Sequence, residues 1–110
     1  MKSINVIDFS EFPGPRYERL GPNSGEKFRE LVLLPPLLAE PNEDLVVNLD
    51  GTAGYGSSFL EEAFGGLIRR GVTHSVALKL CNNLISKEDE SLKEEIRIYI
   101  NEAAERLKDA

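Results

Sequence analysis

Residues 50–58 hold the side chains whose types and spacing could do chemistry. Asp50 comes first, a glycine-rich loop follows it, and Ser57 and Ser58 close the segment. The apolar spacing is that of a strand before Asp50 and that of a helix after the serines. Such a loop points backbone amides, two hydroxyls and the start of a helix at one place, which suits a site that binds something or is modified.

Phosphorylation of Ser57 or Ser58 is the first chemistry that this segment could support. Unpaired amides and the helix dipole favour a phosphate here, whereas Glu61 and Glu62 in the first turn repel its added charge of about −2. The two effects largely cancel. The alternative is that the serines only cap the helix, because Ser58 and Glu61 have capping-box spacing. We favour capping and keep both serines as candidate phosphoacceptors.

Nucleotide binding is a second possibility for the loop. No lysine or arginine follows it, and it has neither the Walker motif nor the spacing of the dinucleotide fingerprint. Arg16, Arg19 or Arg29 would have to fold over the loop to hold a phosphate. We expect these arginines on a solvated surface instead.

The sequence also contains the three residue types of a hydrolytic triad, since Asp50 could orient His74 and His74 could activate Ser57. However, Ser57 lacks a glycine-flanked nucleophile elbow, and we expect His74 at the surface, at the start of a helix. The sequence therefore predicts a protein that is not an enzyme.

Composition excludes further classes of function. Among 110 residues, 13 are basic and 19 acidic, and the net charge of −6 would repel nucleic acid and anionic membranes. Cys81 and His74 are the only residues of their types, so we expect no disulfide, metal site or cofactor. No apolar run approaches the ~20 residues of a membrane span, and we expect a cytoplasmic protein with one domain over residues 1–110.

The elements that must position residues 50–58 alternate between strands and helices. The apolar patterns predict strands at residues 4–9, 45–49 and 80–85. Capping residues predict helices that begin at Asn23 or Ser24, at Ser58, at Thr73, and at Ser86 or Ser91. The alternation predicts an α/β fold around a small sheet, with residues 45–49 as a buried central strand.

Prolines and glycines modify two of these helices. Pro35 and Pro36 predict that the first helix kinks or restarts near Leu34. The pair at residues 65–66 is unfavourable inside the second helix by about 1 kcal/mol per glycine, so we expect a close backbone approach there, either to the sheet or to a partner helix. Gly71 can end this helix in the left-handed conformation.

The residues around the loop also carry a family resemblance. The strand LVVNLD at 45–50, the loop, YGSS at 55–58, the helix and Gly71 are similar to the centre of STAS domains, the fold of anti-sigma factor antagonists and sulfate-transporter tails. More closely, the chain resembles the STAS-like family of small bacterial proteins of unassigned function. That match covers nearly the whole chain, including GPNSGEKFR at 21–29 and YGSSFLEE at 55–62. It implies a small mixed sheet packed with about four helices.

The resemblance implies a function in signal transduction. In antagonist STAS domains a partner kinase phosphorylates a serine that opens the corresponding helix, and this serine falls on Ser57. Gly56 stands where those domains have an aspartate, and Phe59 where they have a glycine. The resemblance therefore implies a surface for protein interaction, with a histidine-kinase-like ATPase as partner, and leaves phosphorylation of Ser57 open.

We accordingly predict a non-enzymatic regulatory module that binds a protein partner through the glycine-rich loop and the following helix. The alternative is a small-molecule or nucleotide sensor that uses the same loop. The oligomeric state stays open. The residues expected to contact the partner or ligand are Gly51, Thr52, Gly54, Tyr55, Gly56, Ser57, Ser58, Phe59 and Glu62.

Overall fold

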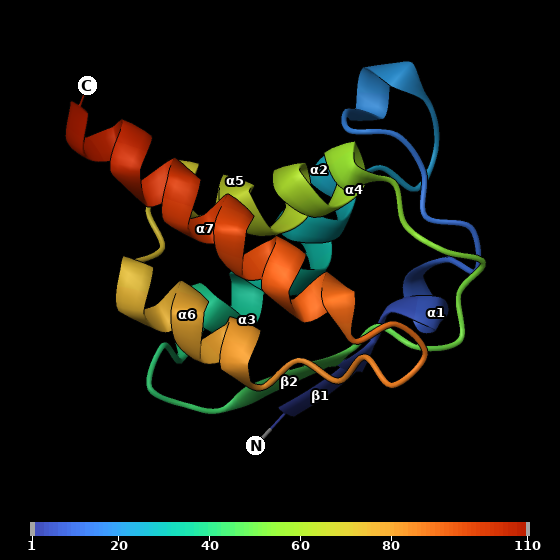
Figure 1. The fold of residues 1–110 in the computed structure, drawn as a ribbon, viewed down its shortest axis with the longest axis horizontal. Helices are drawn as coiled ribbons and strands as arrows, with labels where there is room; N and C mark the ends of the chain where they lie inside the picture. Colours follow the sequence, from blue (N-terminus) through green and yellow to red (C-terminus); the bar gives the residue numbers. More distant parts are fainter. Residues whose placement is uncertain (1, 110) are drawn as a thin grey trace.

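The computed structural model describes residues 2–109, which form a small parallel sheet with helices gathered on one side of it in the view of Figure 1. Strand β1 (Lys2–Asn5) pairs with β2 (Leu45–Asn48), and Lys2 lies opposite Leu45. A further parallel bridge joins Asn48 to Ile85, so β2 has a neighbour on each side. The prediction of a central strand is confirmed, whereas both pairings are parallel where a mixed sheet was expected.

Two predicted strands are wrong in extent. Residues 4–9 divide between β1 and a single helical turn, α1 (Val6–Phe9). Residues 80–82 belong to helix α6 (His74–Asn82), and of the predicted strand only Ile85 pairs with the sheet. The reason is periodicity: α6 buries Ala77, Leu80 and Cys81, which are spaced three and four apart along one helical face. As predicted, Thr73 caps this helix, since its hydroxyl accepts from the Val76 amide at 3.4 Å.

The first long helix runs from Gly25 to Ala39 in three parts. They are α2 (Gly25–Phe28), a π-helical stretch η2 (Arg29–Leu33) and α3 (Leu34–Ala39), and a 3-10 turn η1 (Glu18–Leu20) precedes them. Ser24 caps α2 by accepting from the Lys27 amide at 3.0 Å. The predicted restart at Leu34 is confirmed, because η2 ends at Leu33 and α3 begins at Leu34. Pro35 and Pro36 lack the backbone N–H that an α-helix uses as a donor, and the wider π-helical turn before them accommodates this loss.

The second long helix also contains a π-helical stretch. It comprises α4 (Ser57–Leu60), η3 (Glu61–Gly65) and α5 (Gly66–Arg69). Gly71 takes a φ of +96° after its end, and the Val72 amide closes back onto the Leu67 carbonyl at 3.0 Å, which confirms the predicted left-handed cap. The last helix, α7 (Ser91–Asp109), packs along η3, α5 and α6.

The glycine pair at residues 65–66 is explained by contacts within the chain. A Cβ on Gly65 would lie 3.3 Å from the Tyr99 carbonyl oxygen on α7, and one on Gly66 would lie 2.3 Å from the Arg29 guanidinium. The backbone therefore approaches neighbouring helices and not the sheet, which was the other possibility from sequence.

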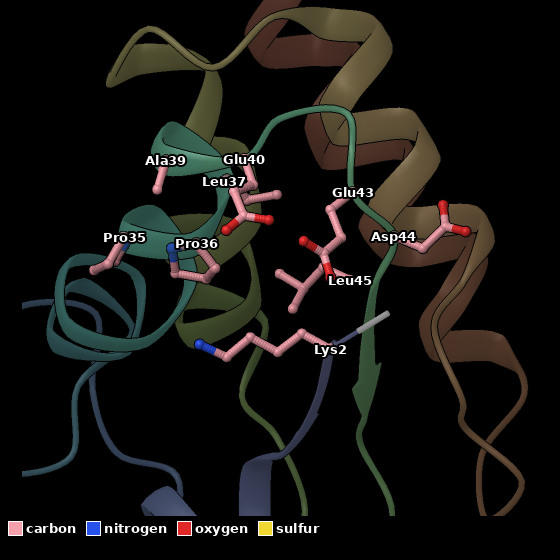
Figure 2. Close-up of a pocket in the computed structure, with 9 residues that line it drawn as sticks. All are labelled: Lys2, Pro35, Pro36, Leu37, Ala39, Glu40, Glu43, Asp44 and Leu45. Atoms are coloured by element: carbon pink, nitrogen blue, oxygen red, sulfur yellow. The ribbon is translucent and has the colours of Figure 1, made fainter.

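The buried apolar residues form one cluster between the helices and the sheet. Its largest fully buried side chains include Phe28, Phe59 and Phe64. No helix among residues 2–109 combines the length and apolar character that crossing a bilayer demands. At the end of the sheet where both strands begin, a groove of about 370 Å³ lies between β1 and α3 (Figure 2).

Candidate functional site

The corner formed by residues 51–58 joins the carboxyl end of β2 to the start of α4. Tyr55 anchors its centre by donating a hydrogen bond to the Leu49 carbonyl oxygen at 2.7 Å. The Ala53 amide donates to the Glu11 carbonyl oxygen at 2.8 Å, which ties the corner to the N-terminal loop. Burial raises the pKa of Tyr55 to about 12, so its hydroxyl keeps its proton and remains a donor at neutral pH.

Asp50 holds the corner to the segment before α7. Its two carboxylate oxygens accept from the amides of Lys87 and Glu88, at 3.1 and 3.0 Å. In return the Gly51 amide donates to Glu88. The carboxylate of Asp50 is thus engaged with backbone amides. His74 lies elsewhere, where its Nε2 is 2.8 Å from the side-chain oxygen of Asn101. The structure does not bring the three residue types of a triad together.

Ser57 and Ser58 are the first two residues of α4, and both side chains are exposed. Gly56 occupies the capping position, and no side chain caps the helix. The predicted capping box is therefore wrong, because the cap lies two residues earlier than expected, at Gly56, and Glu61 binds arginines instead. Most other residues of the expected contact set are also open: Gly51, Gly54 and Gly56 are exposed, and Thr52 and Tyr55 are half-buried.

The other two expected contact residues lie inside the protein. Phe59 is only 1% exposed, and its ring packs against those of Phe28 and Tyr55, each with 5.9 Å between centroids. Glu62 is 7% exposed and is held by Arg29. In this structure neither side chain offers a surface to a partner, because helix periodicity turns both toward the core.

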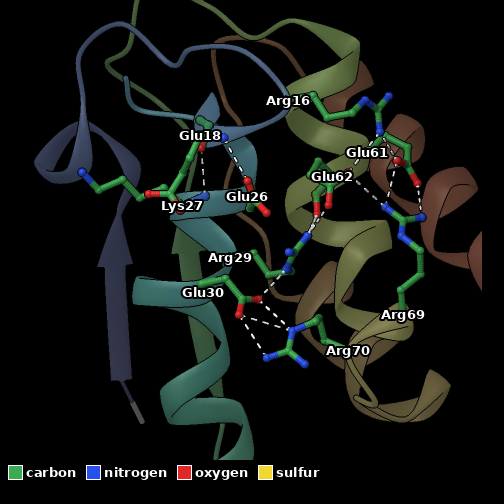
Figure 3. A network of polar contacts seen from close by, with 11 residues as sticks. Arg16, Glu18, Glu26, Lys27, Arg29, Glu30, Glu61, Glu62, Arg69 and Arg70 are labelled. Carbon is green, nitrogen blue, oxygen red and sulfur yellow. Dashed lines mark hydrogen bonds and ion pairs between the residues drawn. The ribbon is translucent and has the colours of Figure 1, made fainter. Parts of the chain in front are cut away.

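Glu61 and Glu62, one turn after the serines in the chain, belong to a network of ion pairs (Figure 3). The Glu61 carboxylate accepts hydrogen bonds from Arg16 at 2.5 Å and from Arg69 at 2.7 and 3.0 Å. Although burial opposes the charge of Glu61, the hydrogen bonds from Arg69 and Arg16 outweigh it and hold the pKa of this carboxyl below its ordinary value. Arg16 also lies 3.4 Å from Glu62, so one guanidinium joins the N-terminal loop to both glutamates.

The buried half of the network centres on Arg29, which joins the two long helices. It pairs with the Glu62 carboxylate and donates to the Glu62 carbonyl oxygen at 2.8 Å. Its Nε donates to Glu30 at 2.8 Å, and Arg70 approaches Glu30 at 3.0 Å. Hydrogen bonds from Arg70 and then Arg29 lower the pKa of Glu30. Among residues 2–109, no buried side-chain nitrogen or oxygen lacks a hydrogen-bond partner.

Sequence reasoning missed this network and placed Arg16 and Arg29 on a solvated surface. A signal for it exists in the helix pattern. Leu33 lies one turn after Arg29, and Glu62 lies one turn after Phe59, so charges of opposite sign fall on the apolar faces of successive helices. A charge on such a face needs a partner of opposite sign, which points to the pair.

The cavity beside the corner is small and acidic. It measures about 190 Å³ and its lining includes Asp50, Thr52, Tyr55, Glu88 and Asp89. None of the three arginines named from sequence as able to hold a phosphate lies over the loop, since Arg16 and Arg29 bind glutamates and Arg19 stacks 5.0 Å from the ring centre of Tyr17. These carboxylates oppose a phosphate. Across the described part of the chain, no three acidic, histidine or cysteine side chains group as a metal site would require.

Comparison with protein families matches residues 24–80 to a model described as a STAS-like domain of unknown function (DUF4325). The matched segment spans slightly more than half of the chain and contains both long helices, β2 and the corner. The search of curated proteins returned no significant match, and neither did the search of solved structures.

Proposed function

We propose that this chain, which belongs to the family of STAS-like domains of unknown function, is a cytoplasmic regulatory module that does no catalysis and binds another protein through residues 51–58. The observation that carries the proposal is the exposure of Ser57 and Ser58 on a corner whose flanks are fixed. Because Tyr55 and Asp50 hold the loop by hydrogen bonds, a partner meets a preformed surface and loses little free energy in ordering it.

Phosphorylation of this corner would act as the switch. From sequence, Glu61 and Glu62 oppose a phosphate on the serines. In the structure Arg16 and Arg69 lie against Glu61, and Arg29 pairs with Glu62, so the local charge is largely neutralised. This neutralisation removes most of the repulsion that weighed against a phosphoserine one turn earlier in the helix.

The partner proposed by analogy is a histidine-kinase-like ATPase, as for the antagonist STAS domains that the chain resembles. Fold likeness alone supports this identity. The sensor alternative has less support, because the cavity beside the loop is acidic and would disfavour an anionic nucleotide.

Affinity capture from the native host tests the contact surface. We expect wild-type protein to retain a specific partner that Ser58→Asp loses. Ser75→Asp is the matched control, because Ser75 is likewise an exposed second residue of a helix, in α6. An aspartate is favourable in the first turn of either helix, so both variants should fold. If both variants retain the partner as wild type does, the corner is not the contact surface.

Two further measurements separate the switch from the sensor. Intact mass of protein purified from the native host should show a gain of one phosphate, which Ser57→Ala or Ser58→Ala abolishes. An unmodified mass under every growth condition contradicts the switch. Thermal stabilisation by a nucleotide panel would instead support the sensor.

A further inference from the structure

The two exposed serines at the start of α4 have different neighbours. Ser58 lies three residues before Glu61 and four before Glu62, and side chains at these spacings are neighbours on a helix, with roughly 5–6 Å between Cβ atoms. Arg16 contacts both of these glutamates, at 2.5 and 3.4 Å. Figure 3 shows Arg16 and Arg69 reaching Glu61 from opposite sides. The Arg16 guanidinium therefore lies on the side of the helix that Ser58 shares with the two glutamates.

Ser57 lies beside two polar residues of α7. The Tyr99 hydroxyl donates a hydrogen bond to the Glu95 carboxylate at 2.6 Å. This bond raises the pKa of Tyr99, and the Ser57 hydroxyl acts in the opposite direction, so Ser57 lies next to the pair. Within residues 2–109, Glu95 has no arginine or lysine as a partner. A phosphate on Ser57 would therefore meet a carboxylate that repels it.

Arg16 can bind a phosphate without leaving a glutamate unpaired. Both of its contacts with glutamates use Nη1, and its Nη2 and Nε donate no hydrogen bond to any residue within 2–109. Glu61 also binds Arg69 at 2.7 Å, and Glu62 also binds Arg29. The side chain of Arg16 is 30% exposed, so a group on the surface of the helix can reach its guanidinium.

The backbone of Arg16 is fixed while its side chain can turn. Its carbonyl oxygen accepts from the Glu26 amide at 3.0 Å, and the Pro15 carbonyl oxygen accepts from the Gly25 amide at 2.9 Å. These bonds tie the N-terminal loop to the start of α2 and hold the guanidinium near α4 before any phosphate is present. Binding a phosphate there orders little of the chain, which lowers its cost in free energy.

We propose that Ser58, and not Ser57, is the phosphoacceptor of this chain, and that Arg16 binds the phosphate. This assignment rests on the proposed switch at residues 51–58. The Ser58 Oγ attacks the terminal phosphorus of a nucleoside triphosphate held by the kinase; an Oγ–P bond forms, the bond to the bridging oxygen breaks, nucleoside diphosphate leaves, and the hydroxyl proton passes to a base of the kinase. The phosphate then accepts charge-assisted hydrogen bonds from Nη2 and Nε of Arg16. The resemblance to antagonist STAS domains points to Ser57, whereas the contacts in the structure point to Ser58.

The test installs phosphoserine at position 58, or at position 57, during synthesis of the full chain and follows its ³¹P resonance with pH. A cation beside a phosphate favours the dianion, so the second pKa of phosphoserine, ordinarily about 6, should fall by about 1 unit at position 58. Arg16→Met should raise it again by at least about 0.5 unit. The matched control is Arg19→Met, an exposed arginine of the same loop, which should change it by less than about 0.2 unit. At position 57 neither variant should change it.

Two results would overturn the assignment. One is a second pKa at position 58 that Arg16→Met leaves unchanged, and the other is an equal dependence on Arg16 at position 57. If Arg16→Met does not fold, the two positions are compared in the otherwise wild-type chain, where a second pKa at position 57 as low as that at position 58 counts against it. Installed phosphoserine needs neither kinase nor partner. A negative result therefore removes Arg16 as the phosphate ligand and leaves the contact surface at residues 51–58 to be decided by affinity capture.

Discussion

Replacing Arg29 by methionine should destabilise the protein more than any surface charge change. Arg29 is 6% exposed, pairs with the Glu62 carboxylate and donates to the Glu62 carbonyl oxygen and to Glu30, both at 2.8 Å. Methionine fills much of the same volume and removes the cation, so Glu62 is left charged in the protein interior. Loss of one partner from a buried ion pair costs about 3–5 kcal/mol.

The geometry favours the lower part of that range. Arg16 and Arg69 lie 3.4 and 3.5 Å from Glu62 and would still offset part of its charge. We therefore expect Arg29→Met to lower the free energy of unfolding by about 3 kcal/mol, a large share of the roughly 5–15 kcal/mol typical of a domain. The double variant Arg29→Met, Glu62→Leu should recover about 2 kcal/mol, because apolar replacement of both partners is close to neutral.

Urea unfolding at pH 7, followed by far-ultraviolet circular dichroism, measures these differences. Arg106→Met is the matched control, since Arg106 is 72% exposed and its pairing with Glu102 at 3.5 Å is worth under about 0.5 kcal/mol. A loss below about 1 kcal/mol for Arg29→Met would refute the assignment of Arg29 as the tie between the long helices. So would a double variant less stable than the single one.

Three further predictions concern the glycines, the carboxylates and the thiol. Gly66→Ala should destabilise the protein in urea by about 1–3 kcal/mol, because its Cβ would lie 2.3 Å from Arg29. Gly56→Ala has open space at its Cβ and should cost less than Gly66→Ala, namely under about 1 kcal/mol for the preference of a helix cap for glycine over alanine. The arginine contacts hold the pKa of Glu61 below its ordinary value despite burial, so their contribution to stability is present at neutral pH and lost as pH falls through the folded-state pKa; urea midpoints should therefore drop below about pH 4, and less so in Glu61→Gln. Burial raises the pKa of Cys81, and a thiol reagent at pH 7 should label it only as fast as the protein opens; labelling at the rate of a free thiol would contradict its placement in the core.

Local signals in the sequence predicted much of the fold. Ser24, Thr73 and Gly71 each mark a helix end by a hydrogen bond or backbone conformation that involves only nearby residues. The restart before Pro35 follows from the missing proline amide, which is also local. Features of this kind are readable because the residues that cause them lie within one or two turns.

What the sequence did not disclose depends on contacts between distant segments. Residues 80–85 are apolar enough for a strand, and only packing against α7 and the sheet decides that the first half of this segment stays helical. Glu61 was assigned to a cap three residues away, but Arg16, 45 positions earlier in the chain, binds it instead. Long charged side chains have many possible partners, so spacing alone does not identify the one that the fold brings near.

The structure separates the groups that hold the two long helices together from the groups that a partner can touch. Glu61 and Glu62 are committed to arginines, while Ser57 and Ser58, one turn earlier on the same helix, remain exposed. Residues four apart lie on the same side of a helix, so the serines and the glutamates share a side. The division comes from position along the helix, because the arginines contact the glutamates of the second turn and leave the serines of the first turn open. Variants at Arg29 should therefore change stability and leave the contact surface intact, and variants at Ser58 should do the reverse. A Ser58→Asp protein that lost its partner only because it unfolded would show that the two sets of groups are not separate, and the case for the corner as a docking surface would fail with it.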